Sequence, residues 1–105
     1  MAVVRLSTTA QADFDEIVEQ LSVVAGIGVA RKYARGLQAA INRLVDFPGL
    51  GAPRPELGPE TRLVIVDPYL IIYDGGPKSA EVLVLRILHG HRNVTPEVIA
   101  RGRKR

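Results

Sequence analysis

Side chains that can do chemistry gather at the end of one apolar stretch, residues 81–92. Its sequence is E-V-L-V-L-R-I-L-H-G-H-R, and from Val82 to Leu88 it holds six aliphatic residues and one charge, Arg86. His89, His91 and Arg92 follow at once. A guanidinium does not lose its proton in such a run, so Arg86 must reach a partner, a cleft or solvent. We expect any working surface of the protein to lie at this end.

Two interpretations of Arg86 remain open. Its charge is either structural, held by a backbone carbonyl or by an acid such as Glu81 or Asp74, or it is a contact for a target. The histidines are suited to acid–base chemistry because the pKa of histidine lies near neutral pH. As metal ligands His89 and His91 lack a third and fourth partner nearby, and the chain has no cysteine. We therefore expect no metal and no cofactor.

The apolar run 82–88 predicts a central strand that is covered on both faces. Its β-branched residues and the Gly-Gly-Pro sequence before it favour a strand over a buried helix. Apolar residues at three- and four-residue spacing predict two helices joined by a glycine turn. The first helix starts near Thr8 or Thr9, with Gln11 at capping-box spacing, and ends at Gly26 and Gly28. The remaining predicted elements are strands at 2–6, 62–66 and 69–74, and a second helix at 29–46.

This order, β-α-α-β-β-β, predicts an α+β fold in which a helix hairpin packs on one face of a small, mainly antiparallel sheet. The first helix is acidic and the second basic, so their charges could pair across the hairpin, although exposed ion pairs contribute only about 0–1 kcal/mol each and apolar packing is expected to dominate. Residues 47–59 hold four of the seven prolines and predict a long irregular connection. At 105 residues the chain, 1–105, is expected to be one domain.

Charge and composition bound the function. The net charge is +3, and four bases at 101–105 are expected to form a basic flexible tail. The chain has no cysteine, no signal sequence and no apolar run of membrane length, so we expect a cytoplasmic protein without a membrane partner.

The chain resembles the ParE/RelE superfamily of type II toxin–antitoxin toxins, and within it the ParE branch. The resemblance covers nearly the whole chain in order. It rests on Leu6-Ser7 and on residues 12–17, 34–37, 47–51, 62–64, 68–73 and 84–92.

The resemblance implies a small toxin that is neutralised by a cognate, ParD-like antitoxin. ParE-like members are associated with inhibition of DNA gyrase, which would make Arg86, His91 and Arg92 target-binding residues. RelE-like members cleave mRNA on the ribosome, which would make Arg62, Arg86 and His89 catalytic and would require direct nucleic-acid binding. A third alternative is a non-toxic remnant that only binds antitoxin.

Two departures disfavour the RelE-like alternative. RelE-type enzymes commonly carry lysines before the first of their arginine-bearing strands, whereas the loop here contains only Arg54. They also commonly carry a Tyr or His near the end; here a His-Gly-His-Arg run takes the tyrosine's place, in which a histidine could still act as acid or base. Antitoxin binding is a separate expectation: an acidic segment should lie along the apolar rim of the helix hairpin, near Arg31, Lys32 and Arg35.

Overall fold

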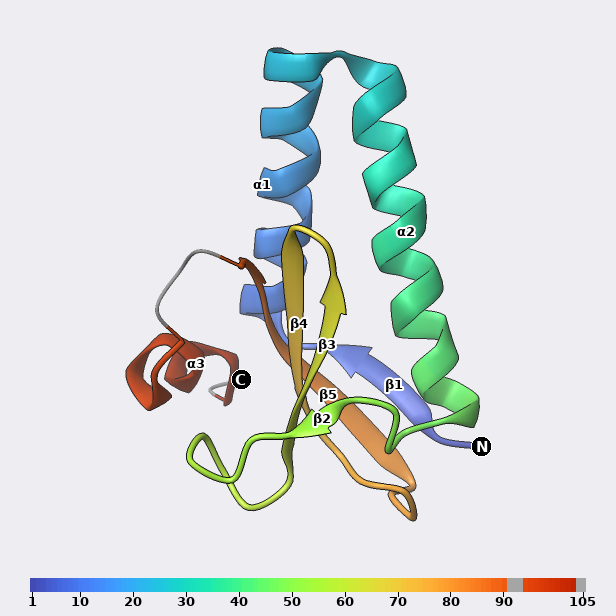
Figure 1. Ribbon diagram of the computed structural model, residues 1–105, viewed down its shortest axis with the longest axis vertical. Coiled ribbons are helices and arrows are strands. Elements are labelled where there is room, and N and C mark those ends of the chain that lie inside the picture. Colours follow the sequence, from blue (N-terminus) through green and yellow to red (C-terminus); the bar gives the residue numbers. More distant parts are fainter. Residues whose placement is uncertain (91–93, 104–105) are drawn as a thin grey trace.

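The computed structural model describes residues 1–90 and 94–103, and Figure 1 shows its arrangement. A helix hairpin stands on one face of a five-stranded sheet with the order β1-β5-β4-β3-β2. β1 runs parallel to β5, and the other neighbours are antiparallel. In chain order the elements are β1 (Val3–Leu6), α1 (Thr8–Ala25), α2 (Ile27–Asp46), β2 (Ala52–Pro53), β3 (Thr61–Val66), β4 (Tyr69–Asp74), β5 (Glu81–His89) and α3 (Pro96–Arg103). The predicted α+β class and the mainly antiparallel sheet are confirmed.

α1 begins where predicted, at Thr8, but its cap is Ser7 rather than a threonine. The Ser7 hydroxyl oxygen accepts a hydrogen bond from the Ala10 backbone N–H at 2.9 Å. The same hydroxyl donates to the Leu85 carbonyl at 3.0 Å. One side chain therefore both starts the helix and fixes it to β5.

Gly26 alone joins the two helices. Its φ of 95° lies in the left-handed region that glycine adopts without strain. α2 starts directly after it, at Ile27, so the prediction that Gly28 ends the first helix is wrong. The ion pairs that could form across the hairpin are also absent between the described residues of α1 and α2. Apolar packing, rather than charge, holds the two helices together.

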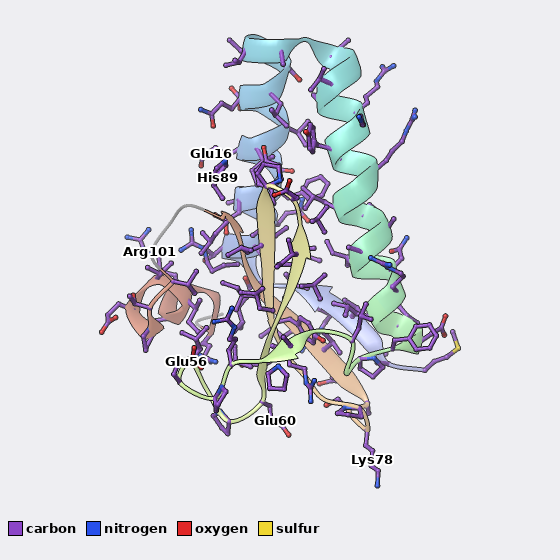
Figure 2. All side chains as sticks on the ribbon, in the orientation of Figure 1. Glu16, Glu56, Glu60, Lys78, His89 and Arg101 are labelled. Atoms are coloured by element: carbon purple, nitrogen blue, oxygen red, sulfur yellow. The ribbon has the colours of Figure 1, made fainter. Side chains whose placement is uncertain are left out.

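The proline-rich connection after α2 is tied to the sheet by hydrogen bonds from β3 and β4. The Arg62 guanidinium donates to the carbonyls of Gly49 and Gly51 at 3.0 and 2.8 Å. The Tyr73 hydroxyl donates to the Pro48 carbonyl and accepts from the Gly51 N–H, both at 2.8 Å. The loop then adds the two-residue edge strand β2. Farther along it, Glu60 points away from the sheet (Figure 2).

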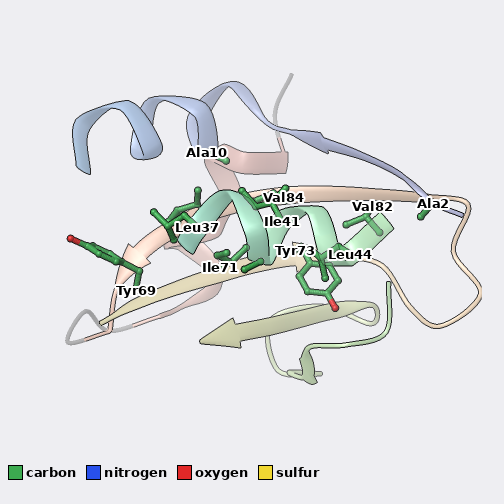
Figure 3. Packing of buried hydrophobic residues seen from close by; sticks show 12 residues of the cluster. Ala2, Ala10, Leu37, Ile41, Leu44, Tyr69, Ile71, Tyr73, Val82 and Val84 are labelled. Atoms are coloured by element: carbon green, nitrogen blue, oxygen red, sulfur yellow. The ribbon is translucent and has the colours of Figure 1, made fainter. Parts of the chain in front are cut away.

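The sheet is buried on both faces, as the apolar run of β5 predicted. Neighbouring residues of a strand point to opposite faces, so Ile71 and Ile72 enter different clusters. The helix-side cluster combines α2 with inward residues of β4 and β5 (Figure 3). The opposite cluster contains Leu57, Leu63, Ile72, Leu85, Leu88 and Ile99.

α3 covers that second face and was not predicted. The expected tail at 101–105 is wrong for residues 101–103, which lie in this helix, while 104 and 105 are outside the described residues. Gly102 is buried against the backbone of Leu85, where even a methyl group would collide with the Leu85 carbonyl. Arg103 bonds Asp74, with Nη2 to Oδ1 at 3.0 Å, and also the Thr61 hydroxyl. The helix is thus held at its buried side and at its end.

Within the described part of the chain, no helix combines the length and the apolar character that crossing a membrane requires.

Candidate functional site: a cleft at the end of the last strand

A cleft of about 370 Å³ opens where β5 ends, between α1 and the start of β4. In Figure 2 Glu16 and His89 are labelled beside one another at this position. Polar and apolar groups share the lining. It consists of Asp13, Glu16, Ile17, Gln20, Leu21 and Val24 from α1, Tyr69 from β4, and residues 86–89 of β5. The cleft therefore lies at the strand end where the sequence predicted a working surface.

The base of the cleft holds a two-pronged ion pair between Arg86 and Asp13. Arg86 Nε donates to Asp13 Oδ2 at 2.7 Å, and Nη2 donates to Oδ1 at 2.9 Å. Arg86 Nη1 donates to the Val98 carbonyl of α3 at 2.7 Å. Both charged side chains are 13% exposed. Arg86 thus has both kinds of partner that the structural interpretation named, a carbonyl and an acid, but the acid is Asp13; Glu81 contacts Arg5, and Asp74 contacts Arg103.

Strand geometry explains why a carboxylate is needed there. β1 pairs with β5 only as far as Val84, and the chain then turns into α1. The edge of β5 beyond that point loses its strand neighbour. The Asp13 carboxylate takes the neighbour's place by accepting a hydrogen bond from the Ile87 N–H at 3.1 Å. The Ser7 hydroxyl does the same by donating a hydrogen bond to the Leu85 carbonyl. The first turns of α1 thus replace missing sheet hydrogen bonds.

The surroundings of Arg86 favour its charged form. Hydrogen bonds to Asp13 raise the pKa of Arg86 above its ordinary value, and the negative charges of Asp13 and Glu16 act in the same direction. Burial opposes this rise but does not cancel it. Arg86 is therefore a permanent cation whose charge is already compensated inside the protein.

The three residues expected to be catalytic in a RelE-like enzyme do not converge. Residues that face each other across neighbouring strands project on the same side of the sheet. Arg62 faces Tyr73, on the helix side, whereas Arg86 faces Ile72, on the α3 side. Arg62 is, in addition, committed to the loop carbonyls. The structure brings Arg86 and His89 to one cleft and leaves Arg62 outside it.

His89 lies at the mouth of the cleft against an aromatic ring. Its ring centroid is 5.8 Å from that of Tyr69, with the planes at 85°. Tyr69 makes a second edge contact with Tyr33 of α2, at 5.9 Å. Burial and the neighbouring Tyr33 raise the pKa of the Tyr69 hydroxyl. The two other predicted target residues, His91 and Arg92, lie outside the described residues.

The predicted antitoxin residues are on a different surface. Arg31, Lys32 and Arg35 are exposed on α2, and none lines the cleft. No ion pair joins them to another described residue. Among described residues, no group of three or more His, Cys, Asp and Glu side chains gathers at a metal-binding spacing.

Comparison with known proteins places this chain in a family. The family model for the ParE toxin of the type II toxin–antitoxin system parDE matches residues 4–94. Toxin ParE1 of Caulobacter vibrioides is 34% identical over 89 residues, which cover 85% of this chain and 90% of the relative. Toxin ParE3 of the same organism is 29% identical over 86 residues, covering 82% of this chain and 84% of the relative.

A solved structure supports the same assignment. It is described as the chromosomal ParDE TA system from P. aeruginosa, and it superposes with a TM-score of 0.69 at 25% identity. The match covers 85% of this chain and 96% of the solved one. The chain therefore belongs to the ParE family: it is the toxin of a type II toxin–antitoxin system, with a cognate antitoxin as its partner.

Proposed function

We propose that this toxin acts in the cytoplasm by binding and inhibiting DNA gyrase, without bond chemistry of its own. The observation that carries the proposal is the commitment of Arg86 to Asp13 and to the Val98 carbonyl. RNA cleavage without a metal needs cations aimed at the charge that develops on the phosphate. Arg86 is compensated by Asp13, and Arg62 projects from the other side of the sheet. Neither arginine is free for that task.

The target surface in this proposal is the cleft and the segment that follows β5. His89 stands at the cleft mouth, and His91 and Arg92 follow it in the sequence. Arg86 contributes chiefly by holding α1 and α3 against β5, because only 13% of its side chain is exposed. Interfaces of this kind concentrate their binding free energy in a few central residues, each worth roughly 2 kcal/mol or more.

The cognate antitoxin occupies another surface in this proposal, along α2. Ile27 is 63% exposed, and Arg31 and Arg35 follow it at the four-residue spacing that places side chains on one helix face. An acidic, amphipathic antitoxin segment would set its apolar side on Ile27 and its carboxylates on Arg31, Lys32 and Arg35. Their charges have no partner among the described residues, so binding does not have to break an internal ion pair.

Two reactions with the purified protein test the gyrase proposal. Gyrase supercoiling of a plasmid should be blocked, while mRNA on translating ribosomes should stay intact. Cleaved mRNA with unaffected gyrase would overturn the proposal and make Arg62, Arg86 and His89 the residues to examine as catalysts. If neither reaction responds, the remnant alternative takes its place.

The antitoxin surface is tested by replacing Arg31, Lys32 and Arg35 together with alanine. Affinity for the cognate antitoxin should fall, and its dependence on salt should become weaker, because exposed charges are screened by salt. The matched control replaces Arg5, Arg54 and Lys78 with alanine; these residues are also exposed, lie outside α2 and carry the same total charge. Equal losses in both triple variants would show a general charge effect rather than this surface.

A further inference from the structure

The two helices of the hairpin carry opposite charges, and outside the cleft the folded chain leaves these charges without an ion-pair partner among the described residues. α1 contains four acids and no base: Asp13, Asp15, Glu16 and Glu19. α2 contains four bases, Arg31, Lys32, Arg35 and Arg43, and one acid, Asp46. Within the described part of the chain, Asp13 is the one member of these sets that forms an ion pair. The exposed side of the hairpin therefore presents a negative helix beside a positive one.

The apex of the same hairpin is apolar and exposed. Val23, Val24, Ile27 and Val29 are 82%, 77%, 63% and 38% exposed. Figure 1 shows that both helices extend past the turn between β3 and β4, so the apex stands clear of the sheet. Isolated exposed apolar residues need no explanation, but four in seven positions at one turn form a contiguous patch. Burial of that patch requires a second molecule.

We propose that, without its antitoxin, the chain associates with a second copy of itself through the hairpin. A two-fold axis running along the hairpin sets α1 of each copy against α2 of the other. Each contact then joins the acidic helix to the basic one, and the two apices meet with their valines and isoleucine. A two-fold interface uses the same patch on both copies, and this surface is complementary to itself under that operation.

Charge selects this arrangement over the alternative two-fold. An axis across the hairpin would set α1 on α1 and α2 on α2, with like charges opposed at both contacts. The apolar apex is smaller than the core of a permanent interface, which usually involves about 20–30 residues a side. The dimer is therefore weak and dependent on salt. It also covers Arg31 and Lys32, so a second copy and the antitoxin compete for the same helix.

Charge reversal gives the sharpest test. One variant carries Asp15→Lys and Glu19→Lys, which turns the two acids of α1 that do not line the cleft into bases; the other carries Arg31→Glu and Lys32→Glu, which leaves α2 with three acids and two bases. Sedimentation of the antitoxin-free chain should show wild-type dimers at high micromolar concentration. Each variant alone should be a monomer. An equimolar mixture should form a one-to-one dimer, because α1 of either variant now opposes α2 of the other with opposite charge.

Several results would overturn the proposal. These are a wild-type monomer at submillimolar concentration, variants that still self-associate alone, or a mixture that does not associate. The matched control, Glu56→Lys with Glu60→Lys, makes the same change in net charge at the opposite end of the molecule (Figure 2) and should dimerise as the wild type does. Raising the salt from ~0.1 M to ~1 M shortens the screening length about threefold and should shift the wild type toward monomer. All substituted positions are exposed, and circular dichroism checks that each variant is folded.

Discussion

Asp13 and Arg86, 73 positions apart in the chain, join three elements through one ion pair. The carboxylate comes from α1, the guanidinium comes from β5, and the third arm of the guanidinium holds the Val98 carbonyl of α3. The same carboxylate closes the open edge of β5 at Ile87. The cleft at the end of β5 has this pair as its floor, so the shape of the candidate site depends on it.

Replacing either partner of this pair should destabilise the fold strongly. Arg86→Met leaves a buried carboxylate without its cation, and Asp13→Leu leaves a buried guanidinium without its acid. Each should lower the free energy of unfolding by about 3–5 kcal/mol. The double variant should lose less than the sum of the two, because neither charge is then left alone. Urea unfolding with unchanged slope measures all three.

The same variants separate a structural role from a target contact. If Arg86→Met unfolded like the wild type but no longer inhibited gyrase, the guanidinium would act on the target and our structural interpretation would be wrong.

The ion pair between Asp13 and Arg86 could not be predicted from the types of the two residues. Asp13 is one of four acids in α1, and the other three are exposed to solvent. Its position in the helical repeat therefore did not distinguish it from them. The acids expected as partners of Arg86 were Glu81 and Asp74, because both lie close to it in the predicted strands. What the sequence did predict was that a guanidinium inside an apolar strand must find a partner. The partner's identity follows from where β1 ends, which is a tertiary fact.

The Tyr73 hydroxyl should make stability depend on alkaline pH. Burial raises its pKa above the ordinary value of about 10, against the smaller opposing effects of the Gly51 N–H and Arg62. A raised pKa in the folded state means that the stabilisation is complete below about pH 10 and is lost as the pH rises through the folded value. Tyr73→Phe should cost about 1–3 kcal/mol at neutral pH, because the Pro48 carbonyl and the Gly51 N–H lose their partner.

Two comparisons make that result specific. The difference in unfolding free energy between wild type and Tyr73→Phe should narrow above about pH 10, because the hydroxyl then loses its proton more readily in the unfolded chain than in the folded one. Tyr69→Phe is the control, since its hydroxyl has no hydrogen bond to a described residue, and its cost at neutral pH should be smaller. A gap that stays constant to high pH would contradict the assignment to Tyr73.

α3 shows why a fold can be predicted well while one of its layers is missed. The helices of the hairpin have long apolar stripes, and the strands have runs bounded by turns, so both kinds of element were recognisable. α3 has eight residues and one fully buried side chain, Ile99. Its start did carry a signal: Thr95 precedes Pro96, and the Thr95 hydroxyl caps the Val98 N–H. The basic residues that follow predicted a solvated tail and outweighed that signal.

Gly102 should tolerate no side chain. A methyl group there meets the carbonyl of Leu85, so Gly102→Ala must push α3 away from β5. Such crowding typically costs about 1–3 kcal/mol. Gly28→Ala is a matched control in another helix, where nothing lies within 4 Å of the added carbon. That change should stabilise the protein by up to about 1 kcal/mol, since alanine favours helix over glycine. If the midpoint of thermal unfolding fell by the same amount in both variants, α3 would not pack on β5 as described.

Filling the cleft should abolish the inhibition of gyrase without unfolding the toxin. Gln20 is exposed and lines the cleft, so Gln20→Trp places a large ring across its opening. Because the substitution is on the surface, stability should stay within about 0.5 kcal/mol of the wild type. Gln38→Trp makes the same change at an exposed position of α2 outside the cleft and should inhibit supercoiling normally. If Gln20→Trp still inhibited gyrase fully, the cleft would not be part of the target surface, and only the segment that follows β5 would remain as a candidate.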